Sequence, residues 1–578
     1  MGRPLTILSF VTEQLYFNAS ADFSQRVGIA LHAINTLLCW ALIFLLARLF
    51  NARQPLLTAA LVAMVWACTP QKASTVLYIV QRMASLACFF ALLACVSYTV
   101  ARTSTRRPVK ITAWGMCLMA VLAAPFAKEL GALVPFYLAT MEVLIFAPLL
   151  GGRLRLPAMI LLAVGLVGFA ALGILEYTHA ETRYAVRNFS FGDRLLSAPA
   201  VLLDYFRQFF VPDTSRLGLI HDDYPVVTNV STLSRFWLPL ALLAATVAWI
   251  ARCLLNGKAD LIAFGLAFFL IGHSLEGSFI PLEIYFEHRN YIPSLGLAIA
   301  LLGIFVQLGI GKKQVGVYGL ALSALVIFAL SQAFSCWNFT ERWNSRSKLL
   351  EHHLTGHPNS SRVHSEYALG LASAGRSEEA HATMQRAYDL ANSEPAARSM
   401  GLGDLGLLSV VVACYAGEPL TERLAPIDGA ALAYPIRTSV ARSMIKMVDT
   451  NTCPDGAWDD VSAWAREVVI AGERADLPPL RFKVGGLQDL AKFERSLENY
   501  VAMYIYASMA SEIQPDNAMF LLLKIEAALQ LGDAAAYEED SEQLRALVAR
   551  GGLSVVERAF LEYVAPALIG LEADTEVD

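Results

Sequence analysis

Long apolar blocks follow one another through the first 335 residues of the chain. The hydrocarbon core of a bilayer is about 30 Å thick, so a helix needs about 20 mostly apolar residues to cross it. Lipid offers no partners to backbone N–H and C=O groups, and such segments must therefore be helical. The sequence predicts an all-α, polytopic membrane bundle with about ten spans, near residues 27–47, 55–70, 85–101, 111–127, 131–150, 157–175, 236–255, 259–275, 291–311 and 315–335.

Two of these blocks, 55–70 and 259–275, are short for a bilayer. We expect their helices to be tilted, broken or partly buried in the bundle.

The composition changes sharply near residue 336. The whole chain is 56% hydrophobic and 16% charged, whereas soluble domains are about a quarter charged. Beyond this point the sequence is rich in Glu, Arg and Ala, which is typical of a soluble helical protein. We predict a membrane bundle over residues 1–336, with a long outside loop at 176–235, and a soluble domain over 337–578. Nothing in the charge pattern indicates a nucleic-acid partner.

The orientation follows from Lys and Arg in the short loops, which concentrate on the cytoplasmic side. Basic residues occur in alternate loops, and the topology predicted from them puts both chain ends outside. The chain is therefore expected in a bacterial inner membrane, with its C-terminal domain in the periplasm. The residues that we place in the cytoplasm are Arg48, Arg53, Arg102, Arg106, Arg107, Lys110, Arg153, Arg155, Arg252, Lys258, Lys312 and Lys313.

Ionisable residues gather in three short segments on the predicted outside, at residues 78–82, 127–129 and 280–294. Charged groups at membrane depth are costly and usually functional. Arg and Lys suit a phosphate, while Glu and His can position an acceptor or accept a proton. The candidate site residues are Gln81, Arg82, Lys128, Glu129, Tyr285, Glu287, His288, Arg289 and Tyr291.

A structural interpretation of these charges stays open. Lys128 with Glu129, and Glu287 with Arg289, would then be mutual ion pairs that hold helices together.

The long outside loop adds two further features. Residues 195–210 have apolar side chains at helical spacing, which predicts a helix in the membrane interface or a lid on the bundle. His221 and Asp222, followed by Asp223 and Tyr224, could act as a base, bind a divalent metal or simply form a turn. The sequence identifies no cofactor.

The C-terminal part contains one segment, 361–394, that resembles a 34-residue tetratricopeptide repeat. A weaker unit occurs near 515–533, so we expect a degenerate helical solenoid that binds a peptide or protein partner. Outside the cell, Cys414 and Cys453 could form a disulfide. The positions expected to pack the two helices of the first repeat are Tyr367, Ala368, Leu371, Ala380, Met384 and Ala387, with Gly375 at the turn.

Several segments occur in the order found in one known family. They are GRPL (2–5), LHAINTLL (31–38), YIVQRMASLA (78–87), the Lys128-Glu129 pair, EHRNYIPSLG (287–296) and a last span that leads through WNFTERWNSRSKLL into a repeat domain. Together they resemble the bacterial relatives of the transmembrane and TPR-containing O-mannosyltransferases, which are GT-C-type glycosyltransferases. The resemblance covers nearly the whole chain.

This resemblance implies a GT-C fold with its active site on the outer face. A sugar would pass, with inversion, from a polyprenyl-phosphate carrier to a protein or glycan acceptor. Arg82, Lys128, His288 and Arg289 are then candidates for the donor phosphate. Glu129 and Glu287 are candidates for orienting the acceptor or sugar.

The chain departs from the family pattern in two places. Thr69-Pro70 and Ser74 stand where relatives have His-Pro and Glu. Relatives also carry a first span and an outside loop with an acidic catalytic base before the GRPL segment. We expect such a segment to precede Met1, because one more span would also place the N-terminus in the cytoplasm. Without it, Glu129 or Asp222 would have to serve as the base.

Two other functions compete with this interpretation. One is a different enzyme of lipid-linked glycans, such as an O-antigen ligase or polymerase. The other is a non-catalytic scaffold whose repeat domain recruits a partner. A transporter is less favoured, because the charged groups cluster at one face and not at mid-membrane.

Overall fold

The computed structural model describes residues 2–184, 187, 189–231, 233–309, 315–393, 402–418, 438–450, 458, 461–463, 481–551, 557, 558, 560 and 561. These residues form helices and no strand. They divide into two compact units, Met1–Pro358 and Asn359–Asp578, which are described separately.

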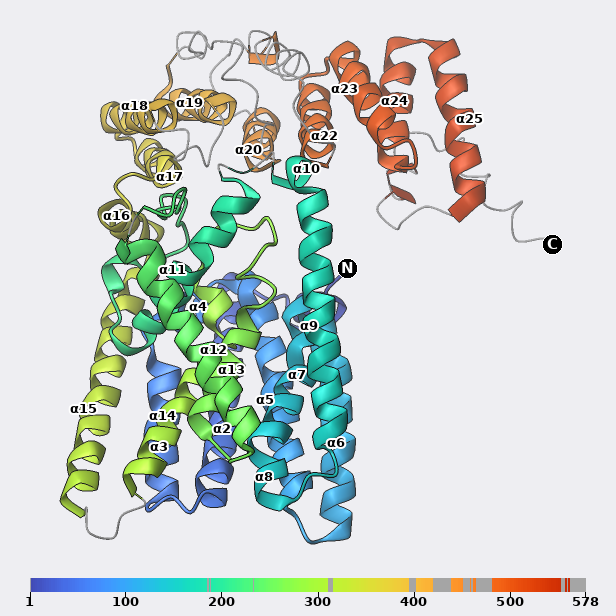
Figure 1. The fold of residues 1–578 in the computed structure, drawn as a ribbon. Coiled ribbons are helices and arrows are strands. Elements are labelled where there is room, and N and C mark those ends of the chain that lie inside the picture. Colours follow the sequence, from blue (N-terminus) through green and yellow to red (C-terminus); the bar gives the residue numbers. More distant parts are fainter. Residues whose placement is uncertain are drawn as a thin grey trace. The chain divides into compact units, whose positions relative to one another are not determined.

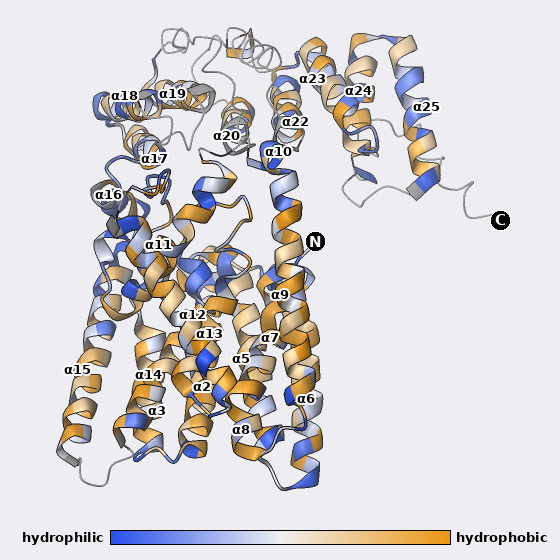
Figure 2. Ribbon diagram, viewed as in Figure 1, coloured by the Kyte–Doolittle hydropathy of each residue, from blue (hydrophilic) through white to orange (hydrophobic). Residues whose placement is uncertain are grey.

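The first unit is a bundle of apolar helices (Figures 1 and 2). A bent pair, α3 (Pro55–Cys68) with the segment Pro70–Leu77, turns by 55° and forms the broken helix expected near residues 55–70. Shorter apolar helices lie at Leu261–His273 (α13) and Ser294–Leu308 (within α14, Ser294–Gly309). Seven segments of the described chain are long and apolar enough to span a membrane: Ala21–Leu49 (α2), Ile79–Thr103 (with α5, Arg82–Thr103), Arg107–Ala127 (α6), Glu129–Leu150 (with α7, Val134–Met141, and α8, Ala147–Leu150), Arg155–Thr178 (α9), Arg235–Asn256 (with α12, Leu238–Asn256) and Gly316–Asn344 (with α15, Val315–Thr340).

The outer surface of this bundle is apolar. On α9, Leu166 is 69% exposed and Val167 is 70% exposed, and α12 and α15 show the same pattern. A contiguous exposed apolar surface of this kind does not occur on soluble monomers, whereas a bilayer accepts it. The chain is therefore a polytopic helical membrane protein. Ten spans remain a prediction, and Lys312 and Lys313 lie outside the described residues.

Short 3₁₀ segments interrupt the helices where the predicted site residues lie. They are Ile79–Gln81, Glu129–Leu133 and Glu287–Asn290. Helix α1 (Pro4–Phe17) packs against α5 and α6, close to the first two of these segments. At each interruption the backbone leaves the α-helix, so neighbouring side chains there point in directions that a continuous helix would not allow.

Helix α11 (Phe191–Phe210) covers the predicted amphipathic segment and packs one face on the bundle. Ser190 and Asp193 form a capping box at its start. Its buried Arg194 donates to the carbonyl oxygens of Glu276, Ser278, Leu282 and Glu283 at 2.6–3.0 Å, which fixes the segment before the third interruption.

The last helix of this unit, α16 (Arg346–Gly356), follows the final apolar segment and holds the segment 213–224. His352 Nε2 hydrogen-bonds the Leu217 carbonyl at 3.0 Å, and the Leu219 N–H donates to His353 Nε2 at 3.0 Å.

The second unit is a set of packed helices. Its first pair, α17 (Ser361–Ser373) and α18 (Ser377–Ser393), turns at Gly375, whose φ of +75° favours glycine. Of the predicted packing positions, Ala368, Leu371, Ala380, Met384 and Ala387 are buried, and Tyr367 is half-buried against the same core. The other helices are α19 (Leu402–Ala416), α20 (Thr438–Asp449), α22 (Arg481–Ser496), α23 (Tyr500–Ile513), α24 (Ala518–Leu531) and α25 (Ala534–Gly551).

Cys414 of α19 is disulfide-bonded. Its predicted partner, Cys453, lies outside the described residues.

Candidate functional site

The three ionisable side chains of residues 287–289 contact different partners. Glu287 Oε1 lies 2.8 Å from His221 Nε2 and accepts the Gly218 N–H at 2.9 Å. Arg289 donates to the carbonyl oxygens of Glu283 and Ile284 and lies over the Phe286 ring. The mutual Glu287–Arg289 ion pair considered above does not occur between these described residues.

Lys128 and Glu129 also point apart. The backbone of Lys128 is extended (φ −156°, ψ 151°), so neighbouring side chains project to opposite sides. Lys128 is buried with its Nζ 2.8 Å from Glu276 Oε1. Glu129 pairs with Arg3 at 3.0 Å and keeps 46% of its side chain exposed. Glu129 is therefore accessible to a ligand, whereas Lys128 is buried in an ion pair with Glu276.

His288 is influenced by several charged groups around it. Its half-buried ring packs on Phe286, with 5.0 Å between ring centroids. Burial lowers the pKa of His288 well below the ordinary value, and the nearby charges of Lys128, Arg289, His221 and Arg3 lower it further. The imidazole is neutral at physiological pH and can accept a hydrogen bond. Three of the four predicted phosphate-binding residues thus act on one another electrostatically.

Arg82 belongs to a separate cluster. Its guanidinium donates to Glu13 Oε1 at 2.5 Å and to the Ser24 carbonyl at 2.9 Å, and it lies over the Phe10 ring. Glu13 comes from α1, so this helix neutralises the arginine. Gln81, next to it, is buried.

The two predicted tyrosines occupy different places. Tyr285 stacks between Tyr205 and Tyr224, at centroid distances of 4.7 and 5.2 Å, and accepts a hydrogen bond from Gln71 at 3.2 Å. Tyr291 is buried among the helices, with its hydroxyl 2.6 Å from His32 Nδ1. Lys72 donates to the Tyr291 carbonyl at 3.3 Å, which makes this a second polar cluster inside the bundle.

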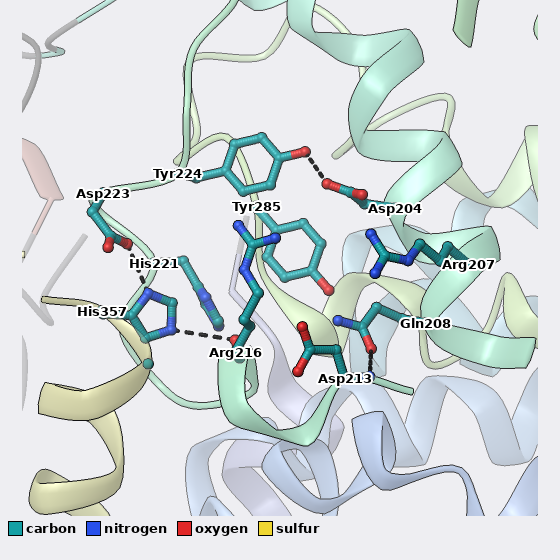
Figure 3. Close-up of a pocket in the computed structure, with 11 residues that line it drawn as sticks. Asp204, Arg207, Gln208, Asp213, Arg216, His221, Asp223, Tyr224, Tyr285 and His357 are labelled. Atoms are coloured by element: carbon teal, nitrogen blue, oxygen red, sulfur yellow. Dashed lines mark hydrogen bonds and ion pairs between the residues drawn. The ribbon is translucent and has the colours of Figure 1, made fainter. Parts of the chain in front are cut away.

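Three of the four residues in the His221–Tyr224 segment line a pocket, and His221 also contacts Glu287. Burial lowers the pKa of His221, but attraction to Glu287 outweighs it and the net pKa is raised. His221 and Tyr285 line a small polar pocket with Asp223 and Tyr224 (Figure 3). Asp222 does not line it. Among the described residues, no group of three or more His, Cys, Asp and Glu side chains is arranged to hold a metal ion.

Several partners escaped the sequence-based prediction. Glu13, Arg194, Glu276, His353 and His357 all contact the polar end of the bundle. Glu13, Glu276 and Arg194 could have been flagged as charges beside apolar segments. For the two histidines of the α16 region the only signal is their spacing in HHLTGH.

The contact between α16 and the 213–224 segment predicts that acid lowers the stability of the folded protein. Burial lowers the pKa of His353 to about 3, and its Nε2 must be unprotonated to accept the Leu219 N–H. The unfolded chain binds a proton near pH 6.5, so stability is lost as pH falls below that value, by about 2 kcal/mol at pH 5. His353→Gln offers an acceptor that does not titrate, and unfolding between pH 7 and 5 should depend less on pH. An unchanged pH slope would contradict this assignment.

Comparisons of the sequence with family models and curated proteins, and of the structure with solved structures, find no match.

Proposed function

We propose that this protein is a membrane glycosyltransferase of the GT-C type. It transfers a sugar from a polyprenyl-phosphate-linked donor to a protein or glycan acceptor on the periplasmic face of a bacterial inner membrane. The observation that carries the proposal is that Lys128 and Arg289, from two segments where the apolar helices are interrupted, both act electrostatically on His288. A lipid-linked donor needs such a combination, because its chain stays in lipid while its phosphate requires cations.

The chemistry assigned to the cluster is stabilisation of the leaving group. The acceptor hydroxyl oxygen bonds to the anomeric carbon, and the bond from that carbon to the phosphate oxygen breaks with its electrons going to the phosphate. Lys128 and Arg289 would stabilise the phosphate charge that develops, and fixed cations in a site of low dielectric do this best. His288 would orient the phosphate or the acceptor.

The acceptor proton would pass to Glu129. Of the predicted carboxylates, Glu287 is buried and engaged by His221. Glu129 combines a half-exposed carboxylate with a place next to Lys128 in the chain, although the two side chains point to opposite sides. The second unit, a TPR-like solenoid in this proposal, would hold the protein acceptor or a partner.

Transfer by the purified chain tests this function. Full-length protein in proteoliposomes is given a polyprenyl-phosphate donor with a radiolabelled sugar, together with membrane and periplasmic protein from the source cells. Label should move into the protein or glycan fraction, and polyprenyl phosphate should be released in equal amount. Transfer only of preassembled oligosaccharide would favour a ligase. No release of carrier, with partner binding that depends on residues 359–578, would favour the scaffold.

A further inference from the structure

The pocket of Figure 3 contains two arginines that are not paired directly with the three aspartates that also line it. Arg207 lies near the end of α11 and Arg216 ends the short 3₁₀ turn Thr214–Arg216. Figure 3 shows both guanidinium groups pointing into the space below Tyr224. Among the described residues, neither guanidinium forms a hydrogen bond or an ion pair, although carboxylates line the same pocket.

Each of these carboxylates has a hydrogen-bond partner other than the two arginines. Asp204 accepts the Tyr224 hydroxyl at 2.5 Å, and Asp223 lies 2.7 Å from His357 Nδ1. Asp213 accepts the hydroxyl of Ser215 at 2.6 Å, two residues further along the chain. These acids therefore fix the walls of the pocket, while the two arginines stay available.

The side-chain amide of Gln208 provides a third hydrogen-bond donor to the pocket. Gln208 Oε1 accepts the Asp213 N–H at 2.8 Å, and this hydrogen bond turns the amide nitrogen of Gln208 toward the pocket (Figure 3). Two guanidinium groups and an amide converge on one space from two chain segments. Guanidinium groups make paired, charge-assisted hydrogen bonds to oxyanions, which lysine cannot reproduce.

The size of the space decides between ligand classes. The cavity measures about 50 Å³, enough for roughly three or four waters. Pockets for larger small molecules measure about 300–1,000 Å³. This volume matches a single tetrahedral oxyanion and is far below that of a pocket that encloses a larger ligand.

We propose that this pocket binds one phosphate group through Arg207, Arg216 and the amide of Gln208. The inference goes beyond the proposed transferase function and does not depend on it. The phosphate can come from a soluble ligand or from a lipid headgroup. Because both arginines are solvent-exposed and carboxylates lie nearby, we expect weak binding that salt reduces further.

Binding of inorganic phosphate to the full-length protein in lipid-free detergent micelles tests the site, with ³¹P NMR line widths as the readout. Arg207→Gln and Arg216→Gln should each weaken binding by about tenfold to a hundredfold. The lysine variants R207K and R216K keep the positive charge but lose the paired hydrogen bonds of the guanidinium group. Their affinity for phosphate should fall between those of the wild type and the glutamine variants. Arg235→Gln, at an exposed arginine outside the pocket, is the matched control and should bind like wild type.

Three results would overturn the proposal: no phosphate binding by wild type, wild-type binding by both glutamine variants, or an equal loss in R235Q. Nanodiscs with and without polyprenyl phosphate identify the source. If the lipid displaces inorganic phosphate, the site takes a lipid phosphate; if it does not, the ligand is soluble. No donor sugar or acceptor is present, so the result is independent of transfer activity.

Discussion

Lys128→Gln is expected to lower sugar transfer by at least about a hundredfold, the loss seen when one fixed donor to a developing charge is removed. Lys128 also pairs with Glu276 at 2.8 Å, so the same variant leaves a buried carboxylate without its partner. A single substitution therefore cannot separate a role in catalysis from a role in stability.

The double variant K128Q/E276Q separates the two roles. It removes both charges and lets two amides of similar shape face each other, which should restore most of the stability lost in K128Q. If Lys128 stabilises the leaving phosphate, the double variant stays inactive although it folds. If Lys128 only holds helices together, activity returns with stability. E276Q alone keeps the lysine and should retain measurable transfer.

Glu13→Ala is expected to destabilise the membrane unit by about 3–5 kcal/mol, because it leaves a buried guanidinium without its carboxylate. Only 3% of the Arg82 side chain and 9% of the Glu13 side chain are exposed. Thermal unfolding in detergent should show the loss as a lower midpoint. The exposed pair Arg376–Glu379 supplies the control, and E379Q should leave the midpoint unchanged.

A compensating variant checks the cause. Glu13→Leu with Arg82→Met replaces both charges by apolar groups, and such replacements of buried ion pairs are often neutral. Recovery of the midpoint is expected. A midpoint as low as that of E13A would show that the charges themselves are not the reason for the loss.

The apolar blocks predicted most of the membrane unit, because each long span carries its own signal. The block near 111–127 is α6, and the short block near 55–70 is a bent pair, as its length indicated. Partners distant in sequence had no such signal. Lys128 and Glu129 looked like an ion pair, but an extended residue sends them to Glu276 and Arg3.

The candidate site was predictable in its residue types but not in its grouping. Lys128, His288 and Arg289 interact electrostatically, whereas Arg82 is bound by α1 and Tyr291 lies within the bundle. The contacts of α16 with the 213–224 segment depend on tertiary packing, which periodicity does not encode. The prediction that Arg82 binds the donor phosphate stays untested.

Donor binding measured by native mass spectrometry tests the central claim most directly. Purified full-length protein is mixed with a polyprenyl-phosphate-linked sugar, and wild type is compared with R289Q and K128Q/E276Q. We expect one retained donor per wild-type chain and much less retained donor in R289Q and K128Q/E276Q. The control variant Arg235→Gln should retain as much donor as wild type. Equal retention by all four proteins, or none by wild type, would contradict a donor-phosphate site at Lys128, His288 and Arg289.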